Sequence, residues 1–226
     1  TTEIYTLSLH DALPIYSPRE TDDRKRYRVV VTALDDAIGR VLKTLDTLRL
    51  TESTVVYFGS DNGAFMLPQR GLEVQTNAPL RDGGVTCWEG GIRVAGMARW
   101  PGVTPQGADC KVMLSAMDLL PMSLAAAGVP VPAGPVLDGR DPTSALRGDS
   151  RPVHEALYFE YQNHQAMRTG PWKLVRPVSR QPWQLYNLEA DQGERNNLAS
   201  AQPDRTSRLA AGYDQWRSRL KAGSTA

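Results

Sequence analysis

Three consecutive segments restrict the possible folds of this chain more than any other feature: a predicted amphipathic helix, a short apolar strand and a polar loop. In residues 30–48, apolar side chains recur at helical spacing with charged residues between them. Residues 53–58, Ser-Thr-Val-Val-Tyr-Phe, form a continuous β-branched and aromatic run. Such a run is typical of a strand in a parallel sheet covered on both faces. The order predicts an α/β fold with the helix packed on the sheet.

The expected strand ends in the loop 59–63, Gly-Ser-Asp-Asn-Gly. Open α/β sheets bind ligands beyond the carboxyl ends of their strands, so Asp61 and Asn62 are candidate ligand residues. Adjacent strand side chains point to opposite faces, but the two glycines permit a turn that brings both side chains to one ion. A carboxylate beside an amide carbonyl suits a hard cation such as calcium. The alternative is a purely structural turn, for which Asp-Asn-Gly is a common sequence.

The middle of the chain predicts a long loop, a strand and a helix. Residues 64–91 are a Gly-containing loop, and residues 92–100 form the expected strand. Glu89 is interpreted as fixing the loop that enters this strand, rather than as a catalytic group. A helix is expected at 115–127, with Asp118 bracing its start, and a Pro- and Gly-rich connector follows it.

The last third of the chain predicts a small antiparallel sheet covered by a terminal helix at 203–220. The strand candidates are residues 156–161, 165–168, 172–175 and 183–188. Lys173 is expected to point outward from a strand whose neighbours point inward. His154 and His164 have no apparent partner, which favours surface or structural roles over catalysis.

Composition excludes several classes of function and selects none. The chain has 226 residues and a net charge of +1 with both signs interspersed, so no basic face indicates a nucleic-acid partner. Cys87 and Cys110 are too few for a disulfide framework, and they lack the spacing of a zinc site. No apolar run is long enough for a membrane span, and the first residues do not resemble a secretory signal.

The chain is expected to divide into three parts. Residues 1–20 are interpreted as an artefact or a disordered leader, because residues 1–15 resemble a translated sequencing-adaptor peptide; a short strand and turn is the alternative. Residues 21–150 form the expected α/β unit. Residues 151–226 form a small α+β subdomain.

Several motifs follow one another in a specific order between residues 27 and 216. They are SDNG (60–63), NAPLRDGG (77–84), WEGGIRV (88–94), RWPG (99–102), SAMDLLP (115–121), LDG (137–139), MRTGPWKLV (167–175) and LYNLEADQGERNNLA (185–199). This order resembles the sulfatase family, arylsulfatase-like, of the alkaline phosphatase-like superfamily. The resemblance implies a partial alkaline phosphatase-like sheet with flanking helices, and it makes residues 21–150 the C-terminal part of a catalytic domain.

The resemblance also implies a chemistry. It implies a calcium ion held in part by Asp61 and Asn62, opposite the sulfate group of the substrate. The family's nucleophile is a formylglycine, made from Cys or Ser in a Cys/Ser-x-Pro/Ala-x-Arg motif that does not occur in these residues. Cys87 and Cys110 are followed by other sequences and are interpreted as buried or incidental thiols. Calcium requires about six to eight oxygens, so two residues give an incomplete site and this chain alone is expected to be inactive.

One departure from the family concerns a lysine that contacts the sulfate. Gly84 lies at or next to its place, and Arg81, the nearest cation, is the candidate sulfate contact. The expected substrate is a sulfate ester of a small molecule or a glycan, and the family implies a periplasmic or secreted protein. Two alternatives stay open: a phosphoester or phosphonate hydrolase of the same superfamily, and a non-catalytic binding homologue.

Overall fold

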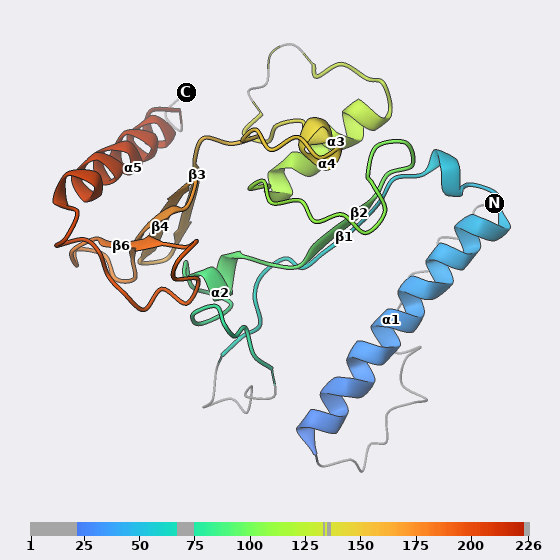
Figure 1. The fold of residues 1–226 in the computed structure, drawn as a ribbon, viewed down its shortest axis with the longest axis horizontal. Coiled ribbons are helices and arrows are strands. Elements are labelled where there is room, and N and C mark those ends of the chain that lie inside the picture. Colours follow the sequence, from blue (N-terminus) through green and yellow to red (C-terminus); the bar gives the residue numbers. More distant parts are fainter. Residues whose placement is uncertain (1–21, 67–74, 133, 135–136, 224–226) are drawn as a thin grey trace.

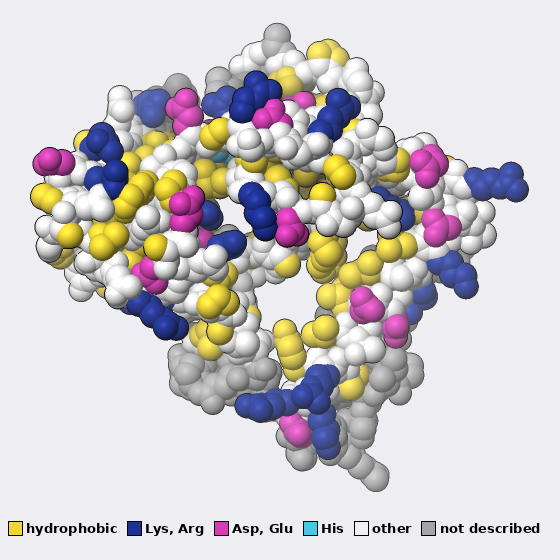
Figure 2. Space-filling model, in the orientation of Figure 1, with side chains coloured by type: hydrophobic (Ala, Val, Ile, Leu, Met, Phe, Trp, Pro, Cys, Tyr) yellow, Lys and Arg dark blue, Asp and Glu magenta, His cyan; other side chains and the backbone are white. Residues whose placement is uncertain are grey.

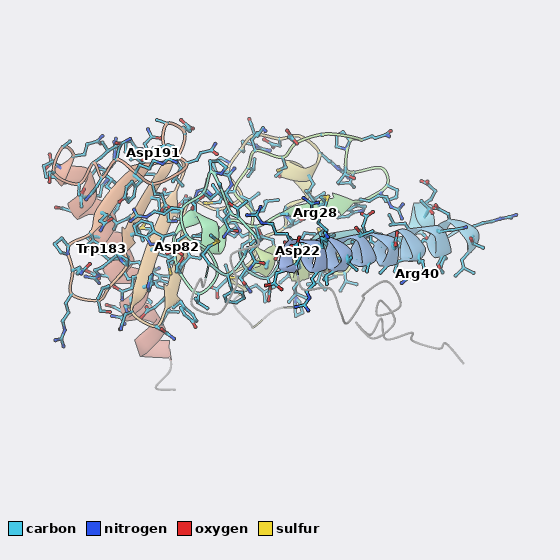
Figure 3. The ribbon with its side chains drawn as sticks, turned by 90° about the horizontal axis from the view of Figure 1, so that it is seen from below. Asp22, Arg28, Arg40, Asp82, Trp183 and Asp191 are labelled. Atoms are coloured by element: carbon cyan, nitrogen blue, oxygen red, sulfur yellow. The ribbon has the colours of Figure 1, made fainter. Side chains whose placement is uncertain are left out.

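The computed structural model describes residues 22–66, 75–132, 134 and 137–223. Its first helix, α1 (Asp23–Thr47), begins at the N-cap Asp22, whose carboxylate accepts from the backbone N–H groups of Arg24 and Lys25. The predicted helix is therefore confirmed. Its predicted packing on a flat surface is not seen among the described residues: α1 stands apart from the C-terminal sheet in two views (Figures 1 and 3), and apolar side chains such as Leu34, 50% exposed, face outward.

A short 3-10 helix, η2 (Thr51–Ser53), leads into strand β1 (Val56–Gly59), which pairs with β2 (Gly96–Arg99). The pairing is antiparallel, and β1 alternates between half-buried and exposed residues. Within the described residues β2 is the only partner of β1, so the parallel neighbours expected from the sequence are not seen there. Side-chain composition favours extended backbone, but it does not choose the partner strand. The strand predicted at 92–100 is shorter than expected: Ile92 ends the helical turn α2 (Glu89–Ile92), and the strand begins only at Gly96.

The helix expected at 115–127 forms as the 3-10 turn η4 (Ala116–Asp118) followed by α3 (Leu119–Ala126). Ser115 and Asp118 form a reciprocal capping box, so the predicted bracing role of Asp118 is confirmed. Gly128, with φ +65°, ends the helix in the left-handed region that favours glycine. A further helical turn, α4 (Thr143–Leu146), lies within the segment expected to be a connector.

The C-terminal sheet has the order β3-β4-β5-β6 with every pair antiparallel, as predicted. Its strands are β3 (Leu157–Tyr161), β4 (His164–Thr169), β5 (Trp172–Arg176) and β6 (Gln184–Asn187). Helix α5 (Pro203–Gly223) covers one face, where Leu209 and Tyr213 pack on Leu174 and Leu185. This helix is red in Figure 1 and lies beside the orange strands.

The opposite face of the C-terminal sheet is covered as well. Cys87 and Trp88, from the loop before α2, pack on Ala166, Val175 and Tyr186. The sheet is therefore a buried middle layer between α5 and the 81–92 segment. The sequence did not predict this layering, which brings the C-terminal sheet next to the motifs NAPLRDGG (77–84) and WEGGIRV (88–94).

None of the helices in the described residues is long and apolar enough to cross a membrane.

On the face shown in Figure 2, positive and negative side chains are interspersed, as the sequence indicated.

Candidate functional site

A tight bend after β1 brings the two predicted ligand residues together. The backbone N–H of Asn62 donates to Asp61 Oδ1 at 2.9 Å, and Ser60 Oγ donates to the carbonyl oxygen of Asn62 at 2.8 Å. Asp61 is exposed and Asn62 is half-buried. Both residues line one cleft of about 1170 Å³. The turn that the flanking glycines permit is therefore present, and the role of Asp61 and Asn62 as ligands of one ion stays a prediction.

The bend is seated on the backbone of α2. The N–H of Gly63 donates to the carbonyl oxygen of Gly91 at 3.0 Å. A Cβ atom at Gly63 would lie 1.6 Å from the carbonyl oxygen of Gly90, so the two backbones touch where only glycine fits. The position of the Asp61–Asn62 bend therefore depends directly on the position of Gly90 and Gly91.

Asn77 joins this bend to the loop that follows it. Its Oδ1 accepts from the N–H of Ala64 at 2.9 Å, and its Nδ2 donates to the carbonyl oxygens of Ala64 and Asp82 at 2.8 and 2.9 Å. The N–H of Gly84 donates to the same Ala64 oxygen at 3.0 Å. Gly84 is therefore beside the bend, and a Cβ placed on it would lie 2.9 Å from Asn62 Oδ1.

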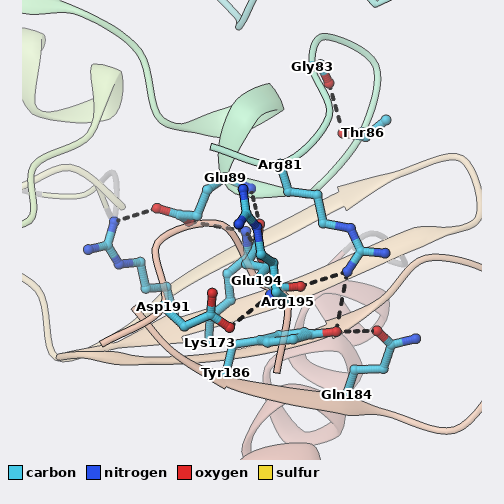
Figure 4. A network of polar contacts seen from close by, with 11 residues as sticks. Arg81, Gly83, Thr86, Glu89, Lys173, Gln184, Tyr186, Asp191, Glu194 and Arg195 are labelled. Carbon is cyan, nitrogen blue, oxygen red and sulfur yellow. Dashed lines mark hydrogen bonds and ion pairs between the residues drawn. The ribbon is translucent and has the colours of Figure 1, made fainter. Parts of the chain in front are cut away.

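Arg81, the candidate anion contact, is engaged with the C-terminal subdomain (Figure 4). Its Nη1 donates to the carbonyl oxygen of Glu194 at 2.8 Å and to the hydroxyl of Tyr186 at 3.3 Å. Its guanidinium carbon lies 3.6 Å from the centroid of the Trp88 ring, within the range of a cation–π contact. These contacts give Arg81 a structural role, and its contact with a sulfate group stays a prediction.

A buried charge cluster lies between α2 and the C-terminal sheet (Figure 4). Lys173 Nζ lies 3.0 Å from Glu89 Oε1 and 2.9 Å from Glu194 Oε1, and all three side chains are fully buried. Glu194 Oε2 accepts from the backbone N–H of Glu89 at 2.7 Å. Arg168, partly exposed, reaches Glu89 Oε2 at 3.3 Å. The cluster contains two carboxylates and two cations, so its formal charge is balanced.

The prediction that Lys173 points outward is wrong, and strand alternation explains the error. Lys173 does lie on the opposite face from Leu174, but the 81–92 segment covers that face. A signal was present in the sequence, because Val175 shares the face of Lys173 and is apolar. A lysine on a strand face that is covered requires a buried carboxylate partner. The interpretation of Glu89 as a residue that fixes its loop agrees with these contacts.

A second buried polar contact joins Asp118 to His154. His154 Nε2 lies 2.8 Å from Asp118 Oδ1, and both side chains are 4% exposed. Asp118 also accepts from the backbone N–H groups of Ser115 and Arg140, each at 2.8 Å. His154 therefore has a partner that the sequence did not reveal. The pair fastens the start of η4 to the loop before α4 and to the segment before β3, which supports a structural role.

The two cysteines lie in different environments. Cys87 is buried, and desolvation raises the pKa of its thiol to about 11, against the lowering influence of Lys173. Cys110 is exposed, and both thiols are free. Neither lies in the sequence context of a formylglycine, which agrees with their interpretation as buried or incidental thiols.

The described residues do not complete a metal site. Within residues 22–66, 75–132, 134 and 137–223, no three His, Cys, Asp or Glu side chains come close enough to hold one ion. Asp61 and Asn62 do supply the donor types that calcium prefers, a carboxylate and an amide carbonyl. The pair therefore fits calcium in donor chemistry and supplies only part of its coordination shell.

Comparison with known proteins identifies the family. The sulfatase family model matches residues 9–129, and a model of the C-terminal region of N-sulphoglucosamine sulphohydrolase matches residues 86–212. The chain belongs to the sulfatase family. Together the two models cover the order of motifs in which the resemblance was seen, including both sides of the buried charge cluster.

Two relatives show how much of a sulfatase this chain represents. It is 35% identical to N-acetylgalactosamine-6-sulfatase of Canis lupus familiaris over 79% of this chain and 34% of that protein. It is 32% identical to human steryl-sulfatase over 73% of this chain and 31% of that protein. The chain spans about a third of the length of these relatives.

Solved structures confirm the sulfatase fold. The crystal structure of Ps i-CgsB in complex with k-i-k-neocarrahexaose superposes with a TM-score of 0.78 at 27% identity, covering 92% of this chain and 46% of that one. A Bacteroides thetaiotaomicron protein linked to the metabolism of multiple glycosaminoglycans superposes with a TM-score of 0.73 at 25% identity, covering 84% and 44%. The expected fold, an alkaline phosphatase-like α/β sheet with a small C-terminal sheet and helix, is therefore confirmed.

In this member of the sulfatase family, the predicted ligand residues, Gly84 and the buried cluster lie on connected segments. Asn62 borders Gly84, and Gly63 rests on α2. Glu89, the first residue of α2, is anchored to β5 by Lys173. The residues named as functional from the sequence are thus held by residues of the C-terminal subdomain.

Proposed function

We propose that this chain is the C-terminal portion of a sulfuric-ester hydrolase that acts on the sulfate ester of a small molecule or a glycan. One structural observation supports the proposal most directly. The bend after β1 presents a carboxylate and an amide oxygen, and its backbone is fixed by close contact with the glycines of α2. A site for a hard cation requires fixed oxygen donors of this kind.

The proposed cofactor is calcium, held in part by Asp61 and Asn62, with further oxygens from residues that this chain does not contain and from the substrate. A bound calcium ion would neutralise charge on the sulfate oxygens and polarise the sulfur centre. Asp61 would act as the anionic ligand and Asn62 as the neutral one. Their role is to hold the cation in place while the ester is cleaved.

The proposed nucleophile is a formylglycine outside these 226 residues. Its sequence motif is absent here, so this chain alone is expected to have no turnover. The names of the relatives include a sugar sulfatase and a sterol sulfatase, which supports an ester of either class. A location in the periplasm or outside the cell stays a prediction.

The test is an assay of the complete gene product on an aryl sulfate and the matching aryl phosphate, with and without a calcium chelator. We expect hydrolysis of the sulfate ester, loss of activity with the chelator and recovery with added calcium. Asp61→Asn should lower kcat/KM by about a hundredfold or more, in the range seen when one electrostatic contact to the reacting group is lost. Asp214→Asn, the same change at an exposed position of α5, is the control and should leave kcat/KM unchanged.

Two other outcomes would refute the proposal. Faster hydrolysis of the phosphate ester than of the sulfate ester would favour a phosphoester hydrolase of the same superfamily. A complete gene without the Cys/Ser-x-Pro/Ala-x-Arg motif, together with calcium binding but no turnover, would favour a binding protein.

A further inference from the structure

The buried charge cluster of Glu89, Arg168, Lys173 and Glu194 is not explained by stability alone. Removing charges from water is costly, and replacing buried ion pairs by apolar residues is often neutral or stabilising. Burial also raises the pKa of Glu194, and the positive charge of Lys173 offsets this only in part. An apolar contact at this place would cover the sheet at lower cost.

The ion pairs of the cluster fix the position and the orientation of Glu89. Lys173 is on β5, one of the two inner strands of a four-stranded sheet, which is a rigid support. Its Nζ contacts one oxygen of Glu89 and one oxygen of Glu194, while the second oxygen of Glu194 accepts from the backbone N–H of Glu89. The contact of Nζ with Glu194 Oε1 has the distance of an ion pair without hydrogen-bond alignment. The side chain and the backbone of Glu89 are thus held at once.

The next step leads from Glu89 to the bend. Glu89 is followed directly by Gly90 and Gly91, on which Gly63 rests. The hydrogen bond from Gly63 to Gly91 is 3.0 Å long, and the Gly63 Cα packs on the Gly90 carbonyl. Neither contact involves a flexible side chain. Because the two backbones are in direct contact with no space between them, a displacement of α2 moves the bend that carries Asp61 and Asn62.

We propose that Lys173 is a positioning residue for the cation site: by pairing with Glu89 and Glu194 it fixes α2 against the C-terminal sheet, and α2 in turn fixes the Asp61–Asn62 bend. The cation part of this proposal rests on the proposed function. The mechanical part, from Lys173 to the Gly63 backbone, does not.

Hydrogen exchange of the 226-residue chain tests the mechanical part. In Lys173→Met, which keeps an unbranched apolar stem, the amides of residues 60–66 and 89–93 should exchange about tenfold faster or more, the factor that about 1.4 kcal/mol of lost local stability gives. The double variant Lys173→Met/Glu194→Gln keeps the formal charge of the cluster balanced and is the matched control for charge burial. It should recover global stability while residues 60–66 still exchange faster than in the unmodified chain.

The outcomes separate positioning from structure. If Lys173 served only to balance charge, all amides of the double variant would exchange as fast as those of the unmodified chain. That result would overturn the proposal. Equal acceleration in the bend and in α5 would show general loosening and would also overturn it. If Lys173→Met does not fold, Glu194→Gln, which keeps the Lys173–Glu89 pair, replaces it with the same readout and a smaller expected acceleration.

Calcium titration of the same variants tests the cation part. Binding to the unmodified chain should be weak, because two ligand residues are present, and Lys173→Met/Glu194→Gln should weaken it by about a further tenfold, about 1.4 kcal/mol. Asp214→Asn should bind as the unmodified chain does. Absence of calcium binding to the unmodified chain would count against the cation site while the exchange result still decides the role of Lys173. Unchanged calcium affinity in the double variant, with binding intact in the unmodified chain, would overturn the positioning role.

Discussion

Gly63→Ala is the smallest change that should displace the candidate site. Its added methyl group would lie 1.6 Å from the carbonyl oxygen of Gly90 and 2.7 Å from its carbonyl carbon, and neither atom belongs to a flexible side chain. Reaching ordinary contact requires the two backbones to separate by roughly 2 Å, given usual carbon–oxygen contact distances. That separation breaks the 3.0 Å hydrogen bond from Gly63 to Gly91.

The magnitude of the effect follows from these two contributions. The hydrogen bond contributes about 1 kcal/mol, and forcing a methyl group into packed surroundings costs about 1–3 kcal/mol. Gly63→Ala should therefore lower the free energy of unfolding by about 2–4 kcal/mol, which for a chain of this size lowers Tm by roughly 5–15 °C. Differential scanning calorimetry measures this change, and calcium titration should show weakened binding in parallel.

Gly212→Ala is the matched control, because it adds the same methyl group in a different environment. Its Cβ would lie 3.6 Å from the Met167 Cε atom, an ordinary contact, in the interior of α5. Alanine is favoured over glycine there by about 1 kcal/mol, so Tm should rise by roughly 2–4 °C. A Tm for Gly63→Ala equal to that of the unmodified chain would refute the inference that the bend is seated on Gly90.

Three further predictions concern the C-terminal subdomain and the thiols. Leu185→Ala, at a fully buried position under α5, should cost about 2–5 kcal/mol in urea unfolding. Burial of Glu160 acts to raise its pKa, but the hydrogen bonds and the charge of Arg217 outweigh this effect and lower the pKa. The stability that the Glu160 carboxylate adds is therefore present above about pH 4.5 and is lost as pH falls through the lowered pKa. In urea unfolding from pH 7 to pH 3, the loss of stability caused by Glu160→Gln should shrink in that acid range, and a loss that stays constant with pH would contradict the assignment. Iodoacetamide should label the exposed Cys110 in the folded chain and Cys87, whose pKa is raised to about 11, only after unfolding, as mass spectrometry can determine.

Local structure was predictable because its causes are local. The helix expected at 115–127 and the bracing of its start by Asp118 depend on residues a few positions apart, and the structure confirms both. The four C-terminal strands follow the same rule, since each is a short run between turn residues. The bend at Asp61 and Asn62 was predicted because glycines flank it.

Pairings between distant segments were not predictable in this way. The antiparallel partner of β1 lies in residues 96–99, and no periodicity within β1 specifies it. His154 finds Asp118 across 36 positions, and Arg81 finds Tyr186 across 105. The apolar face of α1 was visible in the sequence, but the surface that would cover it is not among the described residues.

Lys173 shows most clearly where a periodic pattern stops being informative. Alternation along a strand assigns each side chain to a face, but it does not say whether that face is covered. Here Ala166 and Val175 on the face of Lys173 are fully buried, so the face is interior, and a lysine there requires carboxylates from elsewhere. Those carboxylates come from α2 and from the loop after β6. Lys173, which the sequence predicted to face solvent, therefore joins the C-terminal sheet to α2, on which the bend with the predicted ligand residues rests. Through these contacts, according to our proposal, the C-terminal sheet positions the Asp61–Asn62 bend although it carries none of the predicted metal ligands.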